Sequence, residues 1–276
     1  MDDQPRPIHL SSSEEFYMSN EQGERYLIQI SWPLYIVDGN SLFLTATENA
    51  WLRATSPHYT GGGIVVSIGY PLKGKLFDHL RRSYDLTPPT VNPIAGCGGA
   101  DVFLDFIEKR VRPAVKARFP QMCVSREALY GHSYGGLFVL HALFTRPSLF
   151  DCYMASSPSI WFNDRCILQE ADAFLGKQNT TDEKLASFMV FWGSLEQSCP
   201  RRNNESDEEY RKRKEAAEMV KMADNILELC GMLRGCQRLH TLLAHEYDGE
   251  EHTSVMACSM SRSLTMFFEG WPLCKQ

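Results

Sequence analysis

The sequence lacks three features that would each indicate a particular class of protein. Its nine cysteines include no C-x-x-C pair, so a structural zinc site or a dithiol redox motif has no support. No apolar run approaches the roughly 18 residues of a membrane span. Basic residues are not in excess, because 28 Lys and Arg stand against 34 Asp and Glu, and nucleic-acid binders usually present a basic face. We therefore expect neither a membrane nor a nucleic-acid partner.

We also expect no export signal in this sequence. The first apolar run, residues 26–30, is interrupted by Gln29 and is too short for the core of a signal peptide. The odd, scattered set of cysteines then fits free thiols in a reducing cytoplasm. A secreted protein with disulfide bonds is the alternative that the same cysteine count allows.

The composition of the chain is sufficient for a large hydrophobic core, and its strand-like and helix-like segments alternate. It has 276 residues, of which 43% are hydrophobic and 11% aromatic, so intrinsic disorder is excluded as its main state. The length alone allows one large domain or two small ones. The pattern predicts strands at 25–32, 34–37, 64–68, 128–130, 151–156, 188–192 and 238–244, and helices at 45–54, 101–119, 137–144, 167–175 and 253–268. This alternation predicts an α/β fold with a mostly parallel sheet and helices on both faces, forming one domain over residues 1–276 with an N-terminal arm at 1–20.

Two segments allow more than one interpretation. Only Pro33 separates the first two predicted strands, which is too little chain for a hairpin loop. Either the two form one bent strand or a segment of chain is missing at this point. The second segment is the charge run at 200–222, where Glu and Lys or Arg recur three and four residues apart. This spacing favours a solvated helix with ion pairs over a specific anion or partner site.

The most informative motif is Gly131-His132-Ser133-Tyr134-Gly135, a G-x-S-x-G sequence between a predicted strand and a predicted helix. This context is typical of a nucleophile elbow, in which a sharp turn lifts the serine hydroxyl clear of the sheet. The glycines are needed because side chains would collide across the turn. We therefore predict that Ser133 is a catalytic nucleophile.

A serine hydroxyl needs a general base, and the base needs an acid to orient it. In α/β-hydrolases these residues follow the serine in the order acid, then histidine. His252 lies in a turn just before the last predicted helix, and we prefer it to His245. Glu196 is the first carboxylate after the strand at 188–192, although a Ser–His dyad without it is the alternative. No H-E-x-x-H spacing occurs, so we expect no metal site.

The oxyanion of the tetrahedral intermediate needs two backbone N–H donors. Tyr134, the residue after the nucleophile, is the first candidate. The second donor comes from the loop after the strand at 34–37, where Asn40 is the best candidate and Gly39 the next.

Five separated motifs resemble those of the putative-esterase family, which includes esterase D, the trilactone siderophore esterases of enterobacteria and fungal esterases for ferri-triacetylfusarinine C. In chain order they are Asp38-Gly39-Asn40, Arg81-Arg82-Ser83-Tyr84-Asp85-Leu86-Thr87-Pro88, GHSYGGLF at 131–138, Ser156-Ser157-Pro158-Ser159 and Glu250-Glu251-His252. The resemblance spans roughly residues 8–270 and is strongest to the intracellular siderophore esterases. The family usually has a longer loop where Pro33 meets Leu34.

The resemblance implies an α/β-hydrolase fold with Ser133, Glu196 and His252 as nucleophile, acid and base. It implies a cytoplasmic serine esterase that cleaves ester bonds of a ferric hydroxamate siderophore, with no protein cofactor and with Fe(III) only as part of the substrate. It also places Arg81 and Arg82 beside the substrate, although a salt bridge that anchors their loop is an equal alternative. Trp161 and Phe162 are candidates for an apolar wall, with core packing as their alternative.

Two other functions remain open at this point. An esterase D-like carboxylesterase or thioesterase would act on small acyl esters with the same machinery, in a narrow acyl tunnel rather than a broad apolar cleft. A non-enzymatic binding protein of the same fold is disfavoured, because competent residues occupy the nucleophile, acid and base positions.

Overall fold

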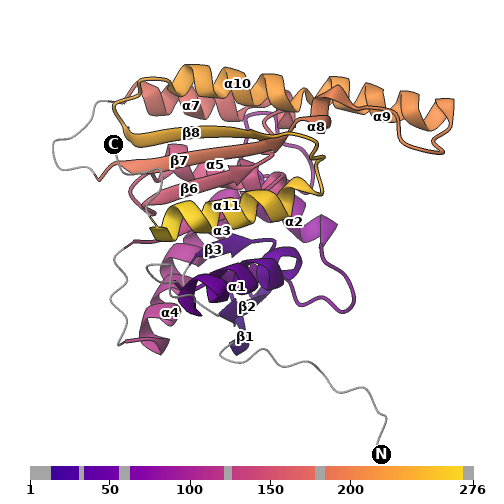
Figure 1. Ribbon diagram of the computed structural model, residues 1–276. Helices are drawn as coiled ribbons and strands as arrows, with labels where there is room; N and C mark the ends of the chain where they lie inside the picture. The colour runs from indigo at the N-terminus through magenta and orange to yellow at the C-terminus, as the bar shows by residue number, and fades with distance from the viewer. Residues whose placement is uncertain (1–13, 31–33, 56–62, 121–125, 178–183, 270–276) are drawn as a thin grey trace, which may run out of the picture.

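The computed structural model of the chain describes residues 14–30, 34–55, 63–120, 126–177 and 184–269. Its centre is an eight-stranded sheet in the order β1-β2-β4-β3-β5-β6-β7-β8 (Figure 1). The strands are β1 (Glu14–Ser19), β2 (Arg25–Ile30), β3 (Tyr35–Val37), β4 (Val66–Gly69), β5 (Ala128–His132), β6 (Cys152–Ser156), β7 (Ala186–Gly193) and β8 (Leu239–Tyr247). Residues 14–19, predicted to belong to an N-terminal arm, instead form the edge strand β1.

The sheet is mostly parallel, as predicted. Strands β3 to β8 pair in parallel with one another, whereas β2 is antiparallel to both β1 and β4. Since β2 and β3 run in opposite directions on the two sides of β4, the prediction that they form one bent strand is wrong. The junction at 31–33, and with it the question of a missing segment, lies outside the described residues.

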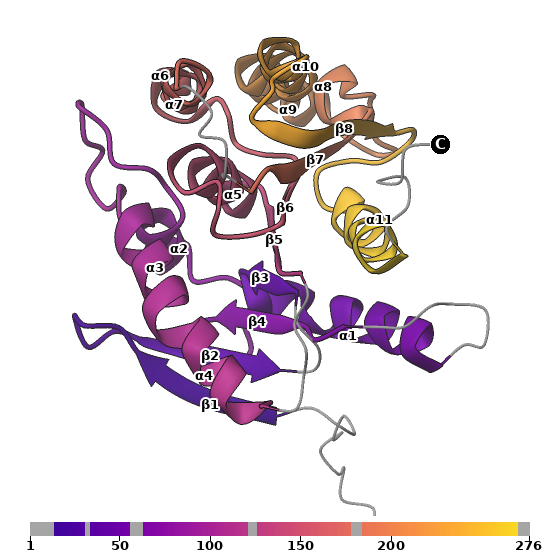
Figure 2. The ribbon, with the colours of Figure 1, turned by 90° about the vertical axis from the view of Figure 1, so that its left-hand side faces the viewer.

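Helices cover both faces of the sheet, which confirms the predicted fold class (Figure 2). Helices α1 and α11 pack together on one face, over a core that includes Ile36, Tyr130 and Met189. Helices α3, α5, α7 and α10 cover the other face. Their bounds, with those of the shorter helices, are α1 (Gly39–Thr55), α2 (His79–Asp85), α3 (Ala100–Phe106), η1 (Ile107–Val111), α4 (Arg112–Arg118), α5 (Tyr134–Thr145), α6 (Phe162–Arg165), α7 (Ile167–Leu175), α8 (Leu195–Ser198), α9 (Asp207–Val220), α10 (Met222–Leu233) and α11 (Val255–Glu269).

The predicted helix at 101–119 is interrupted by a π-helical turn. The Arg112 N–H donates to the carbonyl of Ile107, five residues earlier, and Pro113 follows without an N–H of its own. A proline inside a helix removes one hydrogen bond of the regular pattern, and a wider turn is one way to accommodate it. Helix α2 was not expected in the proline-containing segment at 69–99; Asp78 caps it by accepting from the Arg81 N–H at 3.0 Å.

Because β3 and β5 to β8 are parallel, their carboxyl ends lie at one edge of the sheet. The segments that follow β3, β5, β7 and β8 carry, respectively, Asn40, Ser133, Glu196 and His252. The topology therefore brings together residues that are more than two hundred positions apart in the sequence.

Candidate active site

Ser133 occupies a strained turn between β5 and α5. Its φ of 61° and ψ of −117° lie outside the helical and extended regions. A Cβ on Gly131 would lie 2.2 Å from the carbonyl oxygen of Gly135, so the close approach across the turn requires glycine. The Ser133 N–H donates to the carbonyl of Ser156 at 2.9 Å, which fixes the turn against β6. The serine hydroxyl is thus held at the N-terminus of a helix, where the helix dipole favours a developing anion.

Glu196 and His252 form a short hydrogen-bond contact between the segments that follow β7 and β8. The Nδ1 atom of His252 lies 2.6 Å from Oε2 of Glu196. The glutamate side chain is 2% exposed and the imidazole 45% exposed. The structure brings these two residues together and leaves Nε2 of His252 outside this contact, while their roles as acid and base stay a prediction.

The carboxylate of Glu196 is held by two further donors. Its Oε1 atom accepts from the Ser157 hydroxyl at 2.6 Å and from the Gly193 N–H at 2.8 Å. An ionised carboxylate can only accept hydrogen bonds, and several donors stabilise that charged form when it is buried. Ser157 was not predicted as a site residue; its φ of 42° turns its side chain out of the strand direction after β6.

The loops that carry the acid and the base are joined by backbone hydrogen bonds. Leu195 N–H donates to the carbonyl of Glu250 at 3.0 Å, and Ser194 N–H donates to that of Tyr247 at 2.9 Å. A Cβ on Gly193 would lie 2.2 Å from the Glu250 oxygen, so this approach also requires glycine. The two loops therefore form one unit, which fixes Glu196 relative to His252.

Ser133 is close to this pair without being bonded to it. Its Oγ lies 3.4 Å from the hydroxyl of Ser159, and within the described part of the chain it makes no hydrogen bond to His252. Catalytic hydrogen bonds are often long in the absence of substrate and tighten when it binds. All four side chains, those of Ser133, Ser159, Glu196 and His252, line the same cleft.

His132 lies beside the catalytic histidine candidate, and His245 does not. The His132 ring is 4.5 Å from the His252 ring, centroid to centroid, and its Nδ1 lies 3.1 Å from the Ser156 hydroxyl. Burial, with a smaller effect of His252, holds the pKa of His132 well below its usual range, so this ring stays neutral. His245 is an exposed residue of β8. The geometry agrees with the preference for His252.

The predicted oxyanion donors lie at two helix N-termini that meet. Tyr134 is the first residue of α5, and Asn40 lies in the first turn of α1, where backbone N–H groups have no partner within the helix. A Cβ on Gly135 would lie 3.0 Å from the Val37 side chain, which shows that α5 abuts the end of β3. The Asn40 side chain is engaged elsewhere, with the backbone of Tyr70 at 2.7 and 2.9 Å. The role of both N–H groups stays a prediction.

The structure places Arg81 and Arg82 in ion pairs within the fold. Arg82 contacts both carboxylate oxygens of Asp38 at 2.7 to 3.1 Å, and Arg81 lies 3.5 Å from Asp85. Neither arginine lines the cleft that contains Ser133. These contacts favour the anchoring alternative, and a direct contact with substrate stays a prediction.

A cleft of about 270 Å³ lies over the three predicted catalytic residues. Trp161 is part of its wall and is 37% exposed, whereas the next residue, Phe162, is buried. The residues that line the cleft are Ser133, Ser159, Trp161, Leu195, Glu196, Cys199, Arg202, Arg213, Ala216, Ala217, Val220, Met222, Glu251 and His252. The predicted apolar wall therefore contains Trp161, while Phe162 belongs to the core.

Helix α9 also contributes to this cleft, a role that its charge pattern does not predict. The charge run at 200–222 forms α9 with ion pairs at i, i+3 and i, i+4, as predicted. However, Arg213, Ala216, Ala217 and Val220 line the cleft. Residues that are three, four and seven positions apart share one face of a helix. This spacing is the feature of the sequence from which a cleft-lining face of α9 could have been predicted.

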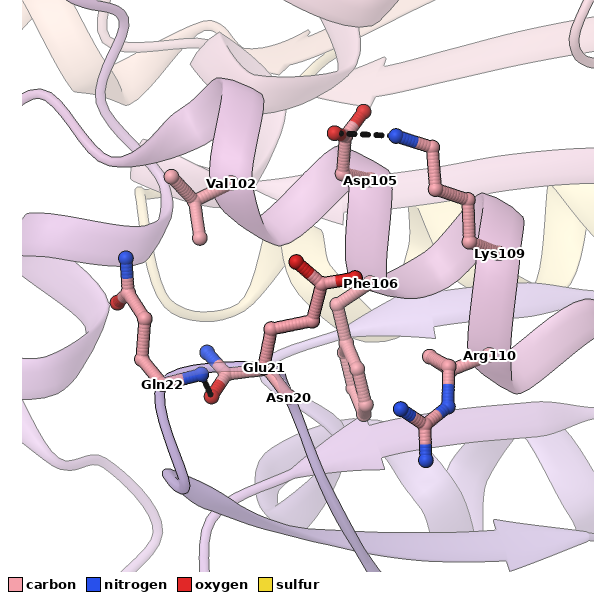
Figure 3. A pocket seen from close by; sticks show the side chains of 8 residues that line it. All are labelled: Asn20, Glu21, Gln22, Val102, Asp105, Phe106, Lys109 and Arg110. Atoms are coloured by element: carbon pink, nitrogen blue, oxygen red, sulfur yellow. Dashed lines mark hydrogen bonds and ion pairs between the residues drawn. The ribbon is translucent and has the colours of Figure 1, made fainter.

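A second hollow lies beside β1 and β2, on the side of the sheet away from β8 (Figure 3). It has a volume of about 170 Å³ and is formed by the turn between β1 and β2 together with α3 and η1. Its polar groups bond one another, since Lys109 pairs with Asp105 at 2.7 Å and the Gln22 N–H donates to Asn20 Oδ1 at 3.0 Å. Nothing in it resembles a catalytic group. Among the described residues there is also no cluster of three or more His, Cys, Asp or Glu side chains that would hold a metal ion.

Comparison with known proteins agrees with this geometry. A family model described as "Putative esterase" matches residues 33–229. The "Siderophore triacetylfusarinine C esterase" of Aspergillus fumigatus is 61% identical over 99% of this chain and 98% of its own. The "Siderophore enterobactin esterase" of Emericella nidulans is 43% identical over 86% of this chain and 87% of its own.

A solved structure, "Siderophore hydrolase EstB from Aspergillus nidulans", superposes with a TM-score of 0.94 at 55% identity and covers 99% of this chain and 100% of that one. The fold is therefore that of the α/β-hydrolases, and no helix of the described ranges is long and apolar enough to cross a membrane. On the evidence of its sequence, topology and site, the chain belongs to the esterase family and is a carboxylic ester hydrolase.

Proposed function

We propose that the protein is a serine esterase that hydrolyses ester bonds of a ferric hydroxamate siderophore of the triacetylfusarinine C type, so that the iron can be released. The names of the relatives at 61% and 43% identity both refer to siderophore esters. The single observation that carries the proposal is the shape of the cleft over Ser133, Glu196 and His252. The cleft is open and its wall includes α8 and α9. This shape suits a bulky siderophore, whereas a small acyl ester would suit a narrow tunnel.

In the first half of the proposed reaction, each of the three side chains has one role. Ser133 Oγ attacks the ester carbonyl as Nε2 of His252 takes its proton. Glu196, bonded to Nδ1 at 2.6 Å, keeps the imidazole in the required tautomer and stabilises the imidazolium that forms. The N–H groups of Tyr134 and Asn40 bind the oxyanion. Collapse of the intermediate breaks the ester C–O bond, and His252 gives its proton to the departing alkoxide.

Water completes the cycle. His252 removes a proton from water, which attacks the acyl-enzyme carbonyl, and the second tetrahedral intermediate releases the acid and returns the proton to Ser133. Apart from this water, every group in these steps belongs to the protein or the ester. Fe(III) enters as part of the ligand, and we propose no protein cofactor.

The charges of the cleft support a neutral substrate. Arg202 pairs with Glu251 at 2.6 Å, and Arg213 pairs with Glu205 at 2.7 Å, so the two cations of the lining are already balanced. A ferric complex of three hydroxamates is neutral, whereas a ferric complex of three catecholates carries three negative charges. Charge complementarity favours the first, because a trianion would need cations that are not committed to carboxylates.

We propose a cytoplasmic location. The seven cysteines within the described ranges are all free thiols, and free thiols persist in a reducing compartment. A ferric chelate imported whole would be cleaved there.

The test is a comparison of kcat/KM for three esters: a ferric trihydroxamate trilactone, a ferric tris-catecholate trilactone and p-nitrophenyl acetate. We expect the neutral trilactone to be the best substrate. Ser133→Ala should abolish hydrolysis of all three, while Ser148→Ala, an exposed control serine outside the cleft, should not change it. A high rate on p-nitrophenyl acetate with no cleavage of either trilactone would refute the proposal in favour of a small acyl ester or thioester.

A further inference from the structure

Helix α9 is an unusual element of this fold, because none of its residues is buried. Most helices in proteins are stabilised mainly by packing an apolar face against the core. Helix α9 extends past the carboxyl ends of β7 and β8, beyond the rest of the molecule (Figure 1). Val220, the last residue of α9, packs against the core, but packing against the core does not account for Ala216 and Ala217.

The two faces of α9 differ in character. Its outer face carries exposed ion pairs, among them Arg211 with Glu215 at 3.0 Å and Lys214 with Glu218 at 3.8 Å. Its inner face, with Ala216, Ala217 and Val220, lines the catalytic cleft. The same cleft contains the exposed ring of Trp161. The apolar face of α9 is thus directed at the space that a bound ester would fill.

Arg213 fixes α9 to the segment that precedes it. Its guanidinium donates to Glu205 at 2.7 and 2.8 Å, to the Pro200 carbonyl at 2.8 Å and to Cys199 Sγ at 2.8 Å. Ser206 caps the helix through a reciprocal contact with Glu209. The inner face is therefore held in a defined position before any ligand binds.

The same segment is joined to the loop of the catalytic base. Arg202, which lies in the turn before α9, pairs with Glu251 at 2.6 Å, and Glu251 is the residue next to His252. Cys199, at the other end of this turn, directly follows the helix that carries Glu196. The position of α9 is therefore defined relative to the acid and the base.

We propose that the inner face of α9 is the recognition surface for the part of the ester that lies away from the reacting carbonyl, and that it selects bulky esters over short ones. Burial of apolar surface favours binding. Only a ligand that extends from Ser133 to α9 buries apolar surface against this face. The small side chains of Ala216 and Ala217 leave the width that such a ligand needs. This inference rests on the proposed function, since it assigns the bulky siderophore to this face.

The test places a bulky side chain on the inner face of α9, in the space that the proposed ligand would occupy. Ala217→Trp and, at a more exposed position, Ala216→Trp should each lower the ratio of kcat/KM for the ferric trihydroxamate trilactone to kcat/KM for p-nitrophenyl acetate at least tenfold. The matched control is Glu218→Trp, which puts the same side chain on the outer face, where Glu218 is 64% exposed. It should leave both rates within twofold of wild type. Circular dichroism and Tm identify any variant that does not fold.

The outcomes separate this inference from the proposed function. If wild type cleaves the trilactone and neither alanine variant changes the ratio by more than twofold, α9 does not select the substrate and the inference is wrong. An equal loss for Glu218→Trp would also overturn it, because the effect would then not depend on the inner face. If wild type does not cleave the trilactone at all, the proposed function fails and this inference fails with it.

Discussion

The ion pair between Arg82 and Asp38 leads to a quantitative prediction about how the oxyanion site is held. The two side chains are 12% and 4% exposed, and Asp38, at φ 53°, directly precedes Gly39 and Asn40. The guanidinium also lies 5.3 Å from the centre of the Tyr134 ring. Arg82 therefore contacts both segments that supply the predicted oxyanion donors.

Replacement of Arg82 by leucine leaves the Asp38 carboxylate buried without its partner. Breaking a buried ion pair in this way costs about 3–5 kcal/mol of unfolding free energy, which corresponds to a decrease in Tm on the order of 10 °C. Displacement of one oxyanion donor lowers kcat about 10²–10³-fold. We expect both effects in Arg82→Leu, with kcat reduced equally for the trilactone and for p-nitrophenyl acetate.

The pH dependence of this variant has a definite sign. Burial raises the pKa of Asp38, and Arg82 opposes that rise. Without Arg82 the pKa rises further, so the folded variant takes up a proton more readily than the unfolded chain and loses stability as the pH rises. The stability defect, measured by urea denaturation, should be smaller at pH 5 than at pH 8.

Two further variants serve as controls. Arg81→Leu removes a neighbouring arginine whose contact with Asp85 is longer, at 3.5 Å, and should cost less stability. Adding Asp38→Asn to Arg82→Leu removes the buried charge and should restore part of the Tm. A normal Tm and kcat in Arg82→Leu, with a raised KM for the trilactone alone, would show that Arg82 binds substrate and does not anchor the loop.

Three other changes have clear expected outcomes. Glu196→Gln should lower kcat for p-nitrophenyl acetate about 10²–10⁴-fold with little change in KM, because the imidazole loses its charged partner; an unchanged kcat would indicate a Ser–His dyad. His141 bonds Glu170 and Asp101; burial lowers its pKa, but the two carboxylates raise it to about 9. Its stabilisation should therefore be complete below about pH 6.5 and lost as the pH rises through 9, by urea denaturation, and His141→Gln should lack this loss. Gly131→Ala should give little folded protein by gel filtration, because the new Cβ meets the Gly135 carbonyl at 2.2 Å; a folded, active variant would contradict the rigid elbow.

The sequence was sufficient to predict the candidate catalytic side chains because each depends on features that are local in the chain. The glycines around Ser133 act across a turn of five residues, and the positions of Glu196 and His252 follow from the ends of two strands that the apolar pattern identifies. Parallel strands end at one edge of the sheet, so the order serine, acid, histidine was sufficient to expect that the three residues meet.

What the sequence indicated by itself is therefore the elbow at Ser133, Glu196 and His252 as candidates for the acid and the base, and the parallel α/β class. Only the tertiary structure decided which residues fill the space between these groups. It alone placed Arg82 on Asp38, Ser157 on Glu196 and the inner face of α9 over the cleft. The physical reason is that backbone strain and strand pattern depend on neighbouring residues, whereas a salt bridge or a cleft wall joins segments whose proximity is set by the order of strands in the sheet.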